Sequence, residues 1–195
     1  LSSAASDVYK RQDLDMIQDY QYKRIVSLNK PIKFGFVRGP VWNFGDEDMK
    51  HGIEEFVKNA QLDIEELDLG KDFDDAAKAH EIIMNGSIAN SLINYYQTDK
   101  SNLHPFTVKR IEAGIPVSAS DYVSAIEQAK KMEQILKQFF LKYDAIITPA
   151  APGQAPRDLM NTGNAIFNGY WTMMGVPAIS LPFLKGIDDL PIGIQ

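Results

Sequence analysis

The sequence contains no cysteine among its 195 residues. Disulfide bonds and thiolate metal sites are therefore excluded, and the composition fits a reducing compartment, which predicts a cytoplasmic location. No apolar run approaches the length of about 18 residues that a membrane-spanning helix needs, so we expect no membrane segment. The first residues, 1–12, also lack the apolar core of a secretion signal.

Basic residues are scarce relative to acidic ones. The chain has 20 Lys and Arg against 26 Asp and Glu, a net charge of -6 and a pI near 5.1. A nucleic-acid partner would require clustered basic residues, so we predict none. The three histidines, His51, His80 and His104, are too far apart for a zinc helix, and no metal site is expected.

The amount of apolar sequence is sufficient for one folded core, because 45% of the residues are hydrophobic. Alternation predicts a strand over Ile32–Val37, and apolar residues at helical spacing predict a helix from Asp46 to Ala60. A second strand is expected over Ile64–Leu69. A strand, helix and strand within about forty residues indicate a βαβ unit with parallel pairing, hence an α/β fold.

The middle of the chain is predicted to be helical. One helix should span Phe73 to Tyr96, and its apolar side is Ala76, Ala77, His80, Ile83, Met84, Ile88, Leu92 and Tyr95. Gly86 within it would permit a close contact with another helix. A short helix should run from Pro105 to Gly114. The longest helix should begin at Ser118, with Asp121 completing a capping box, and end near Tyr143.

The stretch from Tyr143 to Pro182 predicts a strand, a loop, a helix and a strand. The first strand is Asp144–Thr148, and the loop that follows is rich in proline. Thr162 is expected to cap the helix, Gly175 to end it, and Ala178–Leu181 to form a second buried strand. The apolar residues of the helix recur at helical spacing; they are Ile166, Phe167, Tyr170, Trp171 and Met174.

This unit closely resembles the C-terminal part of the amidase signature family, serine amidohydrolases with a Ser–cisSer–Lys triad. The resemblance covers roughly residues 31–195. It implies a partial amidase-signature fold, with a mixed, mostly parallel sheet covered by helices. The residues that carry it are Tyr143-Asp144-Ala145, Thr148-Pro149-Ala150-Ala151-Pro152-Gly153, Ala155-Pro156, Thr162-Gly163, Phe167-Asn168, Trp171-Thr172 and Gly175-Val176-Pro177-Ala178.

The resemblance also sets expectations for the organisation of the chain. Residues 13–195 are expected to be the C-terminal portion of a single amidase domain, incomplete at both ends. Residues 1–12 match nothing in the family pattern and are expected to be an artefactual leader. The family's catalytic serines lie in a Gly/Ser-rich segment, which this sequence lacks: its only adjacent serine pair is Ser2-Ser3. No catalytic residue is therefore assigned, and no metal or organic cofactor is implied.

Five residues are substrate-binding candidates, because the resemblance implies that the proline loop and the following helix lie near the acyl-binding cleft. They are Thr162, Phe167, Asn168, Trp171 and Thr172. Phe167 and Trp171, four residues apart, are equally expected to be core residues on one helix face. Asn168 and Thr172 are equally expected to brace the local backbone. Ser180 lies between apolar residues and is predicted to be a buried hydroxyl bonded to backbone.

The leading functional hypothesis is a fragment of an amidase that hydrolyses a small-molecule amide through a serine acyl-enzyme, the fragment itself being inactive. A non-catalytic α/β binding or interaction module is the alternative, and a piece that aggregates through open sheet edges is a third. The resemblance places an acidic residue of the tRNA amidotransferases at Ala165, so that alanine favours an ordinary amidase. A homodimer is left open.

Overall fold

The computed structural model describes residues 31–158 and 160–195. The prediction for residues 1–12 lies outside the described residues. The part from Ile32 to Gln195 forms one compact unit, to which the following description applies. Within the described residues, no helix combines the length and the apolar character needed to cross a membrane.

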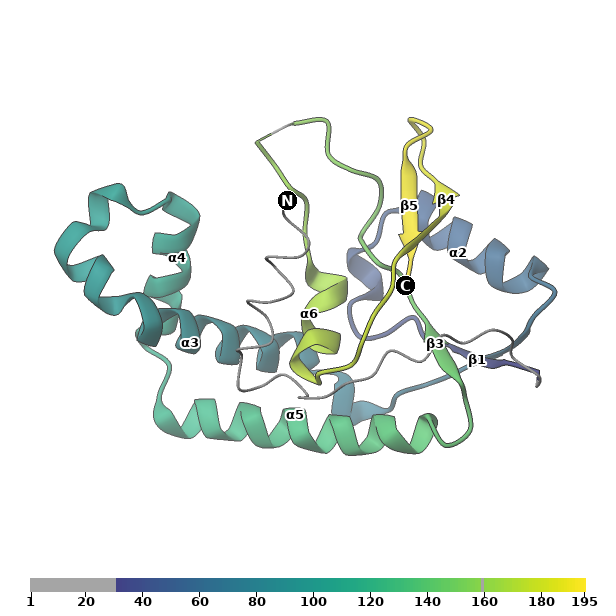
Figure 1. Cartoon of the computed structure of the whole chain (residues 1–195), viewed down its shortest axis with the longest axis horizontal. Coiled ribbons are helices and arrows are strands. Elements are labelled where there is room, and N and C mark those ends of the chain that lie inside the picture. Colours follow the sequence, from purple (N-terminus) through teal and green to yellow (C-terminus); the bar gives the residue numbers. More distant parts are fainter. Residues whose placement is uncertain (1–30, 159) are drawn as a thin grey trace, which may run out of the picture. The chain divides into compact units, whose positions relative to one another are not determined.

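Three parallel strands form one sheet. The middle strand β1 (Lys33–Phe36) pairs on one side with β2 (Asp63–Glu66) and on the other with β3 (Ala145–Ile147). Helix α2 (Glu47–Asn59) connects β1 to β2, and these elements are drawn in purple and blue in Figure 1. The predicted βαβ unit is therefore confirmed, as is the predicted strand after Asp144.

An antiparallel hairpin forms a second sheet, which hydrogen bonds link to the residues after β3. Strand β4 (Leu181–Lys185) pairs with β5 (Pro191–Ile194), and Thr148 exchanges two backbone hydrogen bonds of 2.9 Å with Gln195. The fold is thus mixed α/β. The prediction of a buried strand over Ala178–Leu181 is wrong, because residues 178–180 are exposed and unpaired. The strand begins only where β5 offers a partner, with Leu181 opposite Ile194.

Three further helices follow β2 in the chain. They are α3 (Ala76–Asp99), α4 (Pro105–Gly114) and α5 (Ala119–Phe139), with 3-10 turns at Trp42–Phe44, Lys71–Phe73 and Lys100–Asn102. Figure 1 shows α5 running beneath α3, with α4 at the end of α3 that lies away from the strands. The predicted cap of α5 is confirmed: Ser118 Oγ accepts from the Asp121 N–H at 3.0 Å and lies 2.6 Å from its carboxylate.

The buried side of α3 differs from the predicted one. Small residues dominate it, and the buried set is Ala76, Ala79, Asn85 and Ala89, whereas Tyr95 is exposed. The reason is close helix packing. A Cβ at Gly114 of α4 would lie 2.0 Å from the Asn85 carbonyl oxygen, and one at Gly86 would lie 3.0 Å from the Tyr122 ring. Large side chains on this face would push the helices apart. The predicted close contact at Gly86 is confirmed.

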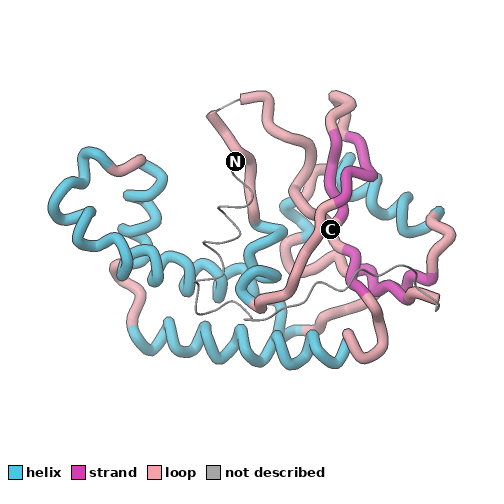
Figure 2. Tube along the Cα trace, in the orientation of Figure 1, coloured by secondary structure: helices cyan, strands magenta, loops and turns pink. Residues whose placement is uncertain are grey.

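The main core lies where the sheet meets α2, α5 and α6 (Ile166–Met173), and Figure 2 shows these helices around the magenta strands. Burying this apolar surface is the main favourable contribution to folding. Its fully buried side chains come from every layer: Phe36, Met49, Ile53, Phe73, Met132, Leu136, Phe167, Tyr170 and Ile192. Helix α6 therefore packs against the core with its buried residues, while its N-terminus lies at the surface.

Candidate substrate site

A hollow of about 740 Å³ with several polar side chains in its lining lies between the proline-rich loop and the first turns of α6. We call it the proline-loop hollow. Its lining is Asp46, Ala150–Pro156, Asn161–Ala165, Asn168, Ser180, Pro191 and Gly193. The proline-rich segment stays in loop form because its prolines lack the N–H groups that a helix or a central strand requires.

Short side chains fold the second half of this loop. The Oδ1 atoms of Asp158, Asn161 and Asn164 each accept a hydrogen bond from the N–H two residues later, at 2.9 to 3.0 Å. These Asx turns replace backbone pairing. The prediction that Thr162 caps α6 is wrong, because Asn164 binds the Ile166 N–H and Thr162 is exposed. Gly163 has φ 85°, which glycine adopts without strain.

Helix α6 is held against the start of the loop by one side chain. Asn168 Nδ2 donates to the Ala150 carbonyl at 3.0 Å, so the predicted bracing role of Asn168 is confirmed. At the other end, Gly175 (φ 69°) donates to the Thr172 carbonyl and Val176 to the Trp171 carbonyl, at 3.0 and 3.3 Å. This Schellman motif ends the helix at the glycine that the sequence indicated.

The C-terminal residue Gln195 ties the same two elements together. Its Nε2 donates to the carbonyl oxygens of Pro149 and Phe167, at 2.9 and 3.2 Å. Because Gln195 also pairs with Thr148 through its backbone, β3, β5 and α6 meet at this residue. These hydrogen bonds fix the start of the proline-rich loop relative to α6, next to the hollow.

Two glycines allow the walls of the hollow to approach closely. A Cβ at Gly153 would lie 2.1 Å from the Asp46 carboxylate, and one at Gly193 would lie 2.4 Å from Ser180 Oγ. The Asp46 N–H also donates to the Pro152 carbonyl at 2.7 Å. The prediction that Ser180 is a buried hydroxyl is wrong: it precedes the first paired residue of β4 and is exposed along the hollow.

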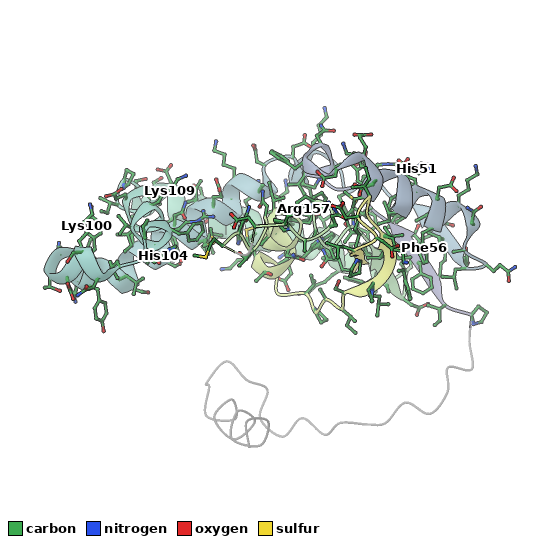
Figure 3. The ribbon with its side chains drawn as sticks, turned by 90° about the horizontal axis from the view of Figure 1, so that it is seen from above. His51, Phe56, Lys100, His104, Lys109 and Arg157 are labelled. Carbon is green, nitrogen blue, oxygen red and sulfur yellow. The ribbon has the colours of Figure 1, made fainter. Side chains whose placement is uncertain are left out.

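An ion pair fastens the loop to the turn of the β4–β5 hairpin. Arg157 pairs with the Asp188 carboxylate, and Gln154 Nε2 donates to it at 2.5 Å. The Arg157 guanidinium, followed by the Gln154 amide, lowers the pKa of Asp188 below its ordinary value. Because these groups are exposed, the contact positions the loop and contributes little stability. Arg157 is labelled in Figure 3.

The five candidate residues do not converge on one surface. Thr162 and Asn168 line the proline-loop hollow, whereas Phe167 is fully buried in the core. Trp171 is largely buried and borders a separate apolar groove, and Thr172 lines a third hollow beside His80. The packing interpretation of Phe167 and Trp171 is confirmed by their burial. A substrate-binding role for any of the five stays a prediction.

Two residues of α6 and the residue after β3 carry buried polar atoms. The Tyr170 hydroxyl, Trp171 Nε1 and Thr148 Oγ1 are buried, and none makes a hydrogen bond of normal geometry within the described part of the chain. Burial raises the pKa of Tyr170 to about 12, and the nearby Thr148 and Trp171 groups offset only part of that rise. Tyr170 is therefore a neutral packing residue at neutral pH.

The lining of the proline-loop hollow suits binding better than proton transfer. Its polar groups are mostly amides and hydroxyls, and among the described lining residues none is Lys, Arg or His. Among the described lining residues Ser180 therefore has no Lys or His to act as the base that nucleophilic catalysis requires. The described residues also contain no cluster of three His, Asp or Glu side chains arranged to hold a metal ion.

The sequence analysis did not assign three residues to the site that line it or brace it. Asp46 reads as an acidic helix start, and Gln195 and Gly193 read as ordinary strand residues. The antiparallel register that places β5 beside residues 148–150 brings Gly193 and Gln195 to the loop, and a hydrogen bond from its N–H to the Pro152 carbonyl brings Asp46 there. The one usable signal was the proline-rich segment itself, whose unpaired backbone requires side-chain partners.

Comparison with known proteins gives the family. The family model described as Amidase matches residues 2–195. The A subunit of glutamyl-tRNA(Gln) amidotransferase from Aliarcobacter butzleri is 33% identical over 112 residues, which are 52% of this chain and 25% of that protein. Its counterpart from Alkaliphilus metalliredigens is 33% identical over 99 residues, 45% of this chain and 20% of that protein. The chain spans at most about a quarter of these relatives' length.

Solved structures share the fold at low sequence identity. One described as the crystal structure of amidase has a TM-score of 0.72 at 16% identity, over 85% of this chain and 42% of that one. A 6-aminohexanoate cyclic dimer hydrolase in complex with substrate gives 0.65 at 15% identity, over 86% and 41%. The predicted partial amidase-signature fold is thereby confirmed. With a family model that matches nearly its whole length, the chain belongs to the amidase family.

Proposed function

We propose that this chain forms the wall of an amidase that holds a small, neutral carboxamide substrate in the proline-loop hollow. In the whole enzyme a serine hydroxyl would attack the amide carbonyl carbon and the C–N bond would break. The amine or ammonia would leave with a proton, and water would then hydrolyse the resulting ester. The serine and its base would come from residues other than those described, so we expect the chain alone to be inactive.

The observation that carries this proposal is the amide-rich lining of the hollow, with Asp46 as its one charged residue among those described, in a member of the amidase family. Asn161 and Thr162 supply side chains that both donate and accept hydrogen bonds, as a carboxamide does. Asp46 is the one charged residue among the described lining residues, and it would disfavour a carboxylate ligand. A neutral amide fits this balance better than an acid does.

The experiment is a binding titration of the chain with benzamide and with benzoate, followed by NMR chemical shifts or calorimetry. We expect the amide to bind and the acid to bind at least tenfold more weakly. Thr162→Val should weaken amide binding at least threefold, whereas Thr172→Val, an exposed threonine on a different hollow, should leave it unchanged. Equal binding of acid and amide, or equal effects of the two variants, would contradict the proposal.

A second candidate is a component of an amidotransferase, favoured by the names of the curated relatives. Ala165, the residue preceding α6, lines the hollow and supplies no charge for the amino group of an amino-acid amide such as glutamine. We therefore expect glutamine to bind no better than a simple amide. Ala165→Asp should increase glutamine binding, and tight glutamine binding by the unchanged chain would favour the amidotransferase.

An assay of amide turnover distinguishes the hypothesis of a non-catalytic module from that of a catalytic fragment. A chain that turns over amides, and loses that turnover in Ser180→Ala, would contradict the expected inactivity. The cytoplasmic location, the homodimer and the absence of a nucleic-acid partner stay predictions. Light scattering of the purified chain and a DNA- and RNA-binding assay test the last two.

A further inference from the structure

An apolar groove of about 410 Å³ lies apart from the proline-loop hollow, and we call it the Phe183 groove. It is bordered by β1, β3, β4, the end of α5 and residues 176–181. Large apolar side chains from distant parts of the chain line it, including Phe34, Phe56, Leu62, Phe140, Ile179 and Phe183. The ring of Phe56 stacks on that of Phe183 with 5.7 Å between centroids, and Figure 3 places Phe56 beside the yellow C-terminal strands.

These side chains are open to solvent to an extent that folding does not explain. The exposed fractions are 75% for Ile179, 59% for Phe183 and 50% for Leu62. Among the described lining residues the only charged one is Asp144, and its carboxylate accepts from the Lys33 N–H at 3.0 Å. Apolar side chains that are exposed together around one groove, rather than scattered singly, are typical of an interaction surface.

The comparison with solved structures indicates what covers the groove. The chain matches 42% of the solved amidase, so more than half of that amidase has no counterpart among the aligned residues. That larger part must pack on the shared substructure through apolar surface, since burial of such surface drives association within a domain. The Phe183 groove supplies such a surface, whereas the proline-loop hollow has more polar side chains in its lining.

We propose that the Phe183 groove is the docking surface for the remaining part of an amidase domain, which would bring apolar side chains into it. A second copy of this chain fits less well. The apolar side chains outside the groove lining that are at least as exposed as Phe183 come singly from six separate segments, so no one segment offers a run of them to fill the groove: Phe44, Tyr95, Phe106, Leu141, Met160 and Ile187. The proposal depends on family membership and not on amide hydrolysis.

The first test is co-expression of the tagged chain with the part of the A. butzleri protein that precedes the matched segment. We expect a one-to-one complex on purification. Ile179→Ser and Phe183→Ser should each weaken it at least tenfold. Ile187→Ser, which is 89% exposed outside the groove lining, is the matched control and should leave it unchanged. A complex that ignores the groove variants would overturn the proposal.

The second test covers the other outcomes and exploits the absence of cysteine. Phe183→Cys is labelled with a maleimide in the chain alone and in a single polypeptide that joins the same section to it, with Ile187→Cys as the control. We expect at least tenfold protection at position 183 only. Equal labelling at 183 in a fusion that shows cooperative unfolding would overturn the proposal. Protection of position 183 in the chain alone would also overturn the proposal if it rises with the concentration of the chain, which indicates a second copy. The same holds if it rises when phosphatidylcholine vesicles are added.

Discussion

Asn168 of α6 donates from Nδ2 to the carbonyl oxygen of Ala150, 3.0 Å away, across 18 positions of sequence. This hydrogen bond holds the start of the proline-rich loop against the first turns of the helix. Both residues line the proline-loop hollow, so the contact sets the distance between two of its walls. The geometry of the candidate site therefore depends on one amide side chain.

Asn168→Ala should destabilise the chain by about 1 kcal/mol, because it removes one partly buried hydrogen bond and leaves the Ala150 carbonyl without that donor. Asn168→Asp should cost more, since a carboxylate would face the same carbonyl oxygen. The measurement is the free energy of unfolding in urea. Thr172→Ala on the exposed side of the helix is the control, and equal losses for Asn168→Ala and the control would contradict the bracing role.

Gly114→Ala should destabilise the chain by about 1–3 kcal/mol, because the new methyl group would collide with the backbone of Asn85 and force α3 and α4 apart. Gly52→Ala is the matched comparison. Gly52 lies within α2, and a Cβ there would contact only Leu184, at 3.4 Å. Replacing this helical glycine should stabilise the chain by up to about 1 kcal/mol. Thermal unfolding of both variants should show shifts of opposite sign, and the same sign would refute the packing argument.

Acid should weaken the attachment of β2 to the end of α5. The Glu65 carboxylate accepts from Lys142, Lys33 and Tyr143 at 2.9, 2.5 and 2.5 Å, and these contacts, Lys142 first, lower its pKa to about 2. A carboxyl pKa that is lower in the folded state stabilises the fold above the unfolded-state pKa of about 4.5. That stabilisation is lost progressively as pH falls from there toward about 2.

Glu65→Gln should therefore be less stable than the unchanged chain at pH 7, and the difference should shrink between pH 4.5 and pH 3. The measurement is urea unfolding across this range. Glu127→Gln, an exposed glutamate on α5, is the control and should keep a constant difference. A pH-independent gap for Glu65→Gln would show that the cluster does not stabilise the fold in this way.

Trp171→Phe and Trp171→Ala should differ strongly. Alanine removes a large buried ring and should cost about 3–5 kcal/mol through the cavity that it leaves. Phenylalanine keeps part of the ring and removes the buried Nε1 donor that lacks a partner within the described residues, so its loss should be less than half as large. Chemical denaturation measures both. Equal losses would mean that Nε1 is satisfied, for example by an ordered water.

Local patterns predicted most of the elements. Alternation at Ile32–Val37, the helical spacing from Met49 to Ala60 and the Ser118–Asp121 cap all describe neighbours in sequence, and each was confirmed. The predicted strand at Ala178–Leu181 failed because its place depends on β5, where the partner of Leu181 is Ile194, thirteen residues later. The prediction of the buried side of α3 failed because helix α4 approaches α3 at Gly114, and no periodicity within α3 reveals that contact.

The sequence by itself determined the family resemblance, the order of the elements and the absence of a Gly/Ser-rich double-serine segment, because all three are properties of residues close together in the chain. Only the tertiary structure decided which candidates share a surface. It joined Thr162 and Asn168 with Asp46 and Ser180, and assigned Trp171 and Thr172 to other surfaces. The physical reason is that a helix as short as α6 presents successive side chains in different directions, so its neighbours, and not its spacing, set what each side chain meets.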